Sequence, residues 1–306
     1  MAGSECRQKV ADDSAADNTS DSAEASARRR LTQCLDDGLG IVDLSHGLLD
    51  DTQLRRVWEV TMRQRHDASS STTLAPVWCL KLAHNRLQRF PAWLVQLFRT
   101  HLRILDLSHN RLRSPLHGLR LASVPRLEVL SLSHNAHIDA LPADWTAELP
   151  STEPHPLCAL DVSHNRLSHI DDACHPTAAQ LRILNASYND IERLPDRLGE
   201  WRSLRSLDLR GNARLALLPP SARQLPEQLM RVDLQGTPLG DAFIPSRIRS
   251  EGVREHGPMA IVRWLAGRSE EALHPSPTER ARLSKALRRG NASEKGQYRE
   301  VLRTLE

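Results

Sequence analysis

The sequence is short of aromatic residues, of net charge and of long apolar runs, and each shortage excludes a class of protein. Aromatic side chains make up only 4% of the residues, so another apolar residue type must fill the core. The formal net charge is +3, which gives no global reason to expect a nucleic-acid partner. No stretch approaches the roughly 20 apolar residues that a membrane-spanning helix needs. The first six residues also lack the apolar run of a signal peptide.

Cysteine is scarce as well, with five residues scattered at positions 6, 34, 79, 158 and 174. The number is odd, and no cysteine follows Cys174, so a disulfide cannot close the C-terminal end of the fold. Such usage is typical of a reducing compartment. We therefore expect an intracellular protein, cytoplasmic in the first place, with the nucleus left open.

Sequence motifs of catalysis are missing. The chain contains no G-x-x-x-x-G-K-[ST], G-x-G-x-x-G, H-E-x-x-H or G-x-S-x-G pattern. His and Asp are frequent because a longer pattern copies them. The sequence therefore predicts no catalytic residue, no cofactor, no metal site and no enzymatic activity.

The pattern that is present returns about every 25 residues. Its cleanest copy, residues 102–112, reads L-x-x-L-x-L-x-x-N-x-L. The L-x-L alternation predicts a short strand with one buried face, which only a stacked neighbour can cover. Eight copies predict a parallel sheet roughly 34 Å wide. The asparagine is expected to be structural, bonding backbone groups in the turn that leaves the strand. It lies at positions 85, 110, 135, 165, 189 and 212, and the weaker first and last copies have Gly47 and Thr237 instead.

The segment after each asparagine follows N-x-L-x-x-L-P-x-x-L, as in residues 85–94 and 189–198. In this pattern the chain resembles the typical intracellular leucine-rich repeat proteins, including the Ras-group class that binds small GTPases, over roughly residues 38–267. The resemblance implies a right-handed α/β solenoid of about eight repeats. It also implies a parallel concave sheet that binds proteins, short convex helices and a helical C-terminal cap.

Four parts of the chain follow from this interpretation. Residues 1–24 are rich in Ala, Ser and Asp and are predicted to be disordered. Residues 25–246 form the solenoid, opened by a capping helix at 25–36 with Leu31 and Cys34 toward the first repeat. A further helix on the convex side is expected, with Asp51 or Thr52 as its N-cap. Residues 247–269 form the C-terminal cap around Ile261, and residues 270–306 form a basic helical tail.

The candidate site consists of residues that lie between the leucines and are expected to face the concave side. One mainly acidic column could attract a basic partner, although L-D-L-S is also a common filler in such repeats. A second column could act as a pH-dependent contact, but an open ladder does not converge four ligands on one metal ion. Together the two columns are Asp43, Lys81, Asp106, Ser131, Asp161, Asn185, Asp208 and Asp233, and His84, His109, His134, His164 and Tyr188.

A third column, running from Ile41 to Arg231, contains mostly apolar residues. It would mark an interface if exposed, but the edge of the fold could equally shield it.

These features predict a non-catalytic interaction module, an intracellular adaptor or scaffold that is monomeric on its own and binds a protein partner on the concave face. One alternative is a regulatory or targeting subunit of a phosphatase, ubiquitin-ligase or small-GTPase complex. Another is a structural component of a cytoskeletal or ribonucleoprotein assembly. The basic tail favours a solvated surface over nucleic-acid binding.

Overall fold

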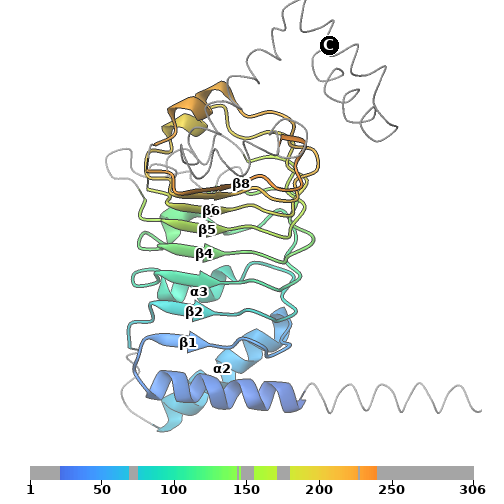
Figure 1. Cartoon of the computed structure of the whole chain (residues 1–306). Coiled ribbons are helices and arrows are strands. Elements are labelled where there is room, and N and C mark those ends of the chain that lie inside the picture. The colour runs from blue at the N-terminus through green and yellow to red at the C-terminus, as the bar shows by residue number, and fades with distance from the viewer. Residues whose placement is uncertain are drawn as a thin grey trace, which may run out of the picture.

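The computed structural model describes residues 21–68, 75–142, 145, 155–170, 180–226 and 228–239. Eight short strands form a single parallel sheet in which each strand pairs with the next one along the chain. In Figure 1 they stack as a column from β1 to β8. The strands are β1 (Ile41–Asp43), β2 (Cys79–Lys81), β3 (Ile104–Asp106), β4 (Val129–Ser131), β5 (Ala159–Asp161), β6 (Ile183–Asn185), β7 (Ser206–Asp208) and β8 (Arg231–Asp233).

All seven strand pairs share one register. The first residue of each strand faces the first of its neighbour, the second the second, and the third the third. The middle residues point inward, and Leu105, Leu130 and Leu207 are at most 1% exposed. The predicted leucine-rich repeat solenoid with its parallel sheet and leucine core is confirmed. The first and third residues of every strand project from the opposite, concave face.

The convex side carries short helical segments, as expected. They are α2 (Asp51–Ala68), α3 (Ala92–Phe98) and three 3₁₀ turns, η1 (Leu121–Ser123), η3 (Leu198–Glu200) and η4 (Pro220–Gln224). The largest, α2, is an enlarged insertion between the first two repeats. Trp58 on α2 meets Phe98 of α3 edge to face, with ring centroids 5.5 Å apart. Apolar side chains on one face of α2 thereby join the core of the solenoid.

The N-cap residue of α2 differs from the predicted one. Asp50, not Asp51 or Thr52, caps the helix, because its carboxylate accepts the backbone N–H groups of Thr52 and Gln53 at 2.8 Å each. The Gln53 side chain accepts the Asp50 N–H in return, which completes a capping box. Burial raises the pKa of Asp50, but these hydrogen bonds outweigh it and the pKa lies below its usual range.

A helix at residues 21–36 closes the β1 end of the solenoid, as Figure 1 shows. It already includes residues 21–24, which were predicted to be disordered. Ala27 and Leu31 are fully buried and Leu35 nearly so, whereas Cys34 is only partly buried. The predicted role of Leu31 is confirmed. Cys34 was the wrong second residue, because Leu35 is the one that faces the core.

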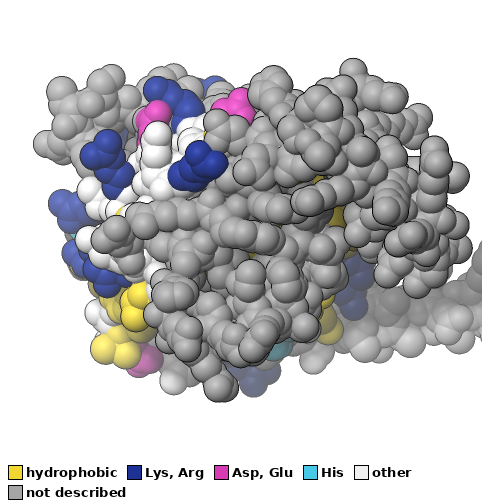
Figure 2. All heavy atoms as spheres, turned by 45° about the horizontal axis from the view of Figure 1, so that its top comes forward, with side chains coloured by type: hydrophobic (Ala, Val, Ile, Leu, Met, Phe, Trp, Pro, Cys, Tyr) yellow, Lys and Arg dark blue, Asp and Glu magenta, His cyan; other side chains and the backbone are white. Residues whose placement is uncertain are grey.

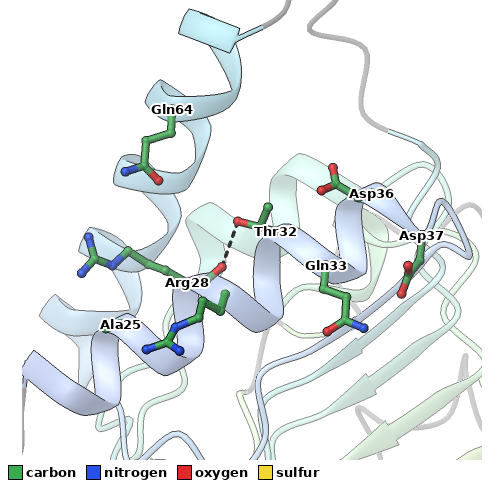
Figure 3. Close-up of a pocket in the computed structure, with 8 residues that line it drawn as sticks. Ala25, Arg28, Thr32, Gln33, Asp36, Asp37 and Gln64 are labelled. Atoms are coloured by element: carbon green, nitrogen blue, oxygen red, sulfur yellow. Dashed lines mark hydrogen bonds between the residues drawn. The ribbon is translucent and has the colours of Figure 1, made fainter.

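The seam between this helix and α2 is a shallow hollow of about 500 Å³. Figure 3 shows the polar side chains that line it, among them Thr32, Asp36 and Gln64. Ion pairs join the two helices beside it, Arg65 to Asp36 and Arg56 to Glu24. The hollow is therefore a polar seam over a packed helix pair.

The predicted C-terminal cap, the basic tail and residues 1–20 lie outside the described residues. Within the described part of the chain, no helix has the length and apolar character needed to cross a membrane.

Candidate protein-binding face

A buried ladder of asparagines fixes the backbone beneath the candidate site. The Asn110 amide nitrogen donates to the carbonyls of Leu82 and Leu107, at 2.9 and 3.1 Å, and its oxygen accepts the Leu87 N–H at 3.1 Å. The side chain thus bonds its own turn and that of the preceding repeat. The same arrangement recurs at Asn85, Asn135, Asn165, Asn189 and Asn212, all at most 7% exposed. The predicted bonding to the turn is confirmed.

In the first six repeats, the residue before the asparagine, or before Gly47 in the first of them, belongs to a column on the concave face. At these positions the backbone is left-handed, with φ between 53° and 57°, a conformation that histidine adopts more readily than most residues. The sheet ladder continues to this point, since the His109 N–H donates to the Ser133 carbonyl at 2.9 Å. The column contains His46, His84, His109, His134, His164 and Tyr188.

The rings of this histidine column stack face to face. Neighbouring imidazoles are 4.0 to 4.2 Å apart and tilted by only 11–12°. The ring of Tyr188 continues the stack at 4.5 Å from His164. The next position is Gly211, where a Cβ atom would lie 2.6 Å from the Tyr188 ring. Tyr188 therefore ends the stack, and glycine leaves room for its ring.

Two central imidazoles of the stack, His109 and His134, are harder to protonate than a free histidine. Partial burial lowers the pKa of His109, and the neighbouring imidazoles of His134 and His84 lower it further, against an opposing effect of Asp106. Burial and the His164 ring lower the pKa of His134 in the same way. Parallel rings hold their nitrogens side by side instead of aiming them at one point. In the described ranges, no three His, Cys, Asp or Glu side chains are grouped to hold a metal ion.

The acidic column has a structural role of its own. The Asp106 carboxylate accepts the Ser108 backbone N–H at 3.0 Å, and Asp161 accepts the Ser163 N–H at 2.9 Å. Asn185 occupies the same place in β6 and accepts from Ser187 at 3.3 Å. Each of these oxygens supports the turn that follows its strand. Support of the turn therefore explains why L-D-L-S is repeated, without any binding partner. It does not explain the negative charge of the carboxylate.

The carboxylates differ in how far the protein already neutralises them. Asp43 lies 3.8 Å from the Lys81 ammonium, and Asp233 lies 3.5 Å from Arg210. Asp208 is only 8% exposed and pairs with the Arg210 guanidinium at 2.8 Å. Among the described residues, no ion pair joins Asp106 or Asp161, and both are partly exposed. Within the acidic column, the carboxylates of Asp106 and Asp161 are therefore the two that remain open to a partner.

The apolar column lies beside them and is partly exposed, not shielded. Its first members, Ile41 and Cys79, are partly exposed and buried respectively. Ile104, Val129 and Ala159 are partly exposed, and Ile183 is 48% exposed. In β7 and β8 the column turns polar, with Ser206 and Arg231. The centre of the concave face, from β3 to β6, thus carries an apolar strip next to two open carboxylates.

Comparison with known proteins agrees with this architecture. Residues 156–213 and 99–115 each match a family model described as leucine-rich repeat. This chain is a leucine-rich repeat protein. Over 62 residues it is 52% identical to the leucine-rich repeat and calponin homology domain-containing protein of Drosophila melanogaster. That match spans 20% of this chain and only 8% of the relative.

Two solved structures are also similar to it. One is a leucine-rich repeat protein of Leptospira interrogans, with 26% identity, a TM-score of 0.40, and coverage of 53% of this chain and 44% of that one. The other is the leucine-rich repeat domain of the type III effector XopL, with 23% identity, a TM-score of 0.36, and coverage of 51% and 60%.

The two ends of the concave face differ in this leucine-rich repeat protein. At the β1 end the helix at residues 21–36 overhangs the strands, leaving a hollow of about 790 Å³. Arg30 of the helix and Asp37 just after it line the hollow together with Lys81, His84 and Asp106 of the concave face. At the β8 end the concave side carries Arg210 and Arg231, paired with Asp208 and Asp233. Figure 2, which brings that end forward, shows dark-blue Lys and Arg side chains gathered on its described part.

The sequence identified the residues of the concave face but not how their side chains pair and stack. All thirteen predicted site residues belong to two aligned columns. Asp208, however, is buried in an ion pair, and Asp43, Lys81 and Asp233 are paired with one another or with arginines. The overhanging helix and the ring stacking were missed. The serine two residues before the asparagine, as in L-S-H-N, is a signal that could have shown how tightly the turns pack, because Ser108, Ser133, Ser163 and Ser187 are at most 9% exposed.

Proposed function

We propose that this leucine-rich repeat protein is a non-catalytic protein-binding module, acting as an intracellular adaptor or scaffold, with its partner on the concave face. The observation that carries the proposal is the centre of that face, where the apolar strip of β3 to β6 adjoins the carboxylates of Asp106 and Asp161. A partly exposed apolar strip costs solvation free energy in the free protein, and an interface removes that cost.

The surrounding columns fit this role. The asparagine ladder and the shared register hold the concave side chains in fixed positions, so a partner does not have to order them on binding. The carboxylates favour a partner with a basic surface and raise the rate of association with it. The stacked histidines add ring edges whose nitrogens can donate or accept hydrogen bonds.

The adaptor role is preferred to the alternatives because the Drosophila relative, by its name, joins leucine-rich repeats to a second domain. A regulatory subunit of an enzyme complex, a small-GTPase partner or a structural role in a larger assembly would use the same face. Those three remain alternatives that the identity of the partner decides.

Affinity capture from cell extract, followed by mass spectrometry, tests the proposal. In the double variant Asp106→Lys/Asp161→Lys we expect an unchanged circular dichroism spectrum and loss of the proteins that the wild type captures. The matched control is Asp190→Lys/Asp196→Lys, which makes the same charge change at exposed positions off the strands. Equal capture by the wild type and the first variant at physiological salt would overturn the proposal.

A further inference from the structure

The centre of the concave face sets the chemistry of what can occupy it. Asp106 and Asp161 lie on β3 and β5, two strand spacings apart, which is about 9.6 Å. The apolar strip runs parallel to this pair, from Ile104 to Ile183. A complementary helix lying across the strands needs an apolar stripe flanked by two basic residues at the same separation. Seven residues of helix rise by about 10.5 Å, so the basic residues must stand at positions i and i+7.

One segment of this chain meets that requirement. Residues 276–290 lie outside the described residues, and their sequence, S-P-T-E at the start and Gly290 at the end, predicts a helix. On a helical wheel Leu283, Ala286 and Leu287 share one face. Arg282 and Arg289, seven residues apart, border that face on the same side, whereas Lys285 and Arg288 fall on the opposite side.

We propose that residues 276–290 dock as a helix across β3 to β6 of the chain's own concave face, with Arg282 and Arg289 against Asp106 and Asp161. The leucines then cover the apolar strip. The inference rests on the proposed function in one respect, namely that the concave face is a binding surface. It adds that the tail and an external partner compete for that surface.

The connection is long enough. The centre of the face lies three to four strand spacings from β8, or about 14–19 Å. Leu239 is the last described residue before this segment, and residues 240–275 together span up to about 120 Å when extended. A helix of 15 residues is about 22 Å long and therefore covers the four strands β3 to β6.

The charges at the two ends of the sheet favour its centre as the docking position of residues 276–290. At the β7–β8 end, Arg210 and Arg231 already pair with the carboxylates of Asp208 and Asp233, which are therefore not open to a basic helix. At the other end, Lys81 already occupies the carboxylate of Asp43, and the helix at residues 21–36 overhangs the strands. Only β3 to β6 offer open carboxylates beside exposed apolar side chains.

Hydrogen exchange of the full chain, read by mass spectrometry, tests the docking. An isolated helix of this length is marginal in water, so strong protection of residues 276–290 reports docking. We expect their amides to exchange at least about tenfold more slowly in the full chain than in a synthetic peptide of the same residues. Asp106→Asn/Asp161→Asn should abolish that protection. Asparagine keeps the turn-supporting oxygen, as Asn185 does in β6.

The tail variants supply the matched pair. Arg282→Gln/Arg289→Gln should lose the protection, and Lys285→Gln/Arg288→Gln, with the same change of charge on the opposite side, should keep it. Exchange as fast as in the free peptide, or protection that survives Asp106→Asn/Asp161→Asn, would overturn the docking. Protection that increases with protein concentration would overturn docking within one chain in favour of a second copy.

The two proposals fail in different ways. If the tail is unprotected while charge reversal at Asp106 and Asp161 still abolishes partner capture, the docking is wrong and the binding face stands. If the tail is protected while capture does not depend on those carboxylates, the external partner binds elsewhere.

Discussion

The asparagine ladder and the histidine column are neighbours in the sequence and opposites in the structure. His109 and Asn110 are consecutive, and both recur with the repeat. The Asn110 amide is buried and bonds backbone groups of two repeats, whereas the His109 ring stands on the concave face and stacks on the rings of His84 and His134. Repetition alone therefore does not reveal a role. The direction of the side chain, set by the left-handed backbone at the histidine, separates a structural column from a surface column.

The largest effect is expected in the ladder. Asn110→Ala removes the partner of the Leu87 N–H and of two buried carbonyls, which should lower the free energy of unfolding by roughly 1–3 kcal/mol. Urea denaturation measures it. The control is His109→Asn, because asparagine tolerates the left-handed backbone, and its effect should be much smaller. Equal losses in the two variants would remove the distinction between the columns.

A somewhat smaller loss is expected where the histidine column ends. Gly211→Ala places a Cβ at φ 69° and within 2.6 Å of the Tyr188 ring. The backbone strain alone costs about 1–2 kcal/mol, and the ring adds to it. In a Tyr188→Ser background only the backbone cost should remain. Thermal denaturation of the four proteins in this double-mutant cycle tests the idea, and strictly additive effects would show that Gly211 does not make room for the ring.

The third prediction concerns the pH dependence of stability and compares the buried His155 with the exposed histidine column. His155 accepts the Leu157 N–H on Nδ1 and so donates from Nε2 to the Val124 carbonyl at 3.1 Å. Burial lowers its pKa, against a smaller opposing effect of hydrogen bonds to backbone carbonyls. The folded protein therefore binds this proton less readily than the unfolded chain. The stability it supports is full above the ordinary histidine pKa and is lost as the pH falls below it.

Melting temperatures at pH 7 and pH 5 test this. The wild type should lose stability on acidification, and His155→Gln, which keeps a donor and an acceptor, should lose less. A His46→Asn variant serves as the comparison from the exposed column and should behave like the wild type. The same pH response in wild type and His155→Gln would contradict the assignment.

The smallest effect is a change of pKa within the stack. His134→Asn removes one of the rings that lower the pKa of His109, so the pKa of His109 should rise. Titration of the His109 ring signals by NMR in the two proteins measures this. An unchanged pKa would mean that the stacked rings titrate independently.

Sequence periodicity was sufficient to predict the fold because each repeat has the same spacing of leucines. The spacing of leucines fixes which residues point inward, and only in-register stacking buries them all, so the eight strands and the buried asparagines were predictable. The N-cap of α2 was not, because Asp50, Asp51 and Thr52 are all good capping residues and only the backbone path selects among them.

The sequence by itself also listed the side chains of the concave face, since alternation along a strand dictates their direction. Only the tertiary structure decided which of them are available. Asp106 and Asp208 hold identical places in their repeats, yet Arg210, two residues after Asp208, pairs with it, whereas Ser108 stands at the corresponding place after Asp106. The pairs of Lys81 with Asp43 and of Arg210 with Asp233 join neighbouring repeats, and a one-dimensional pattern does not contain the distances between side chains of different repeats.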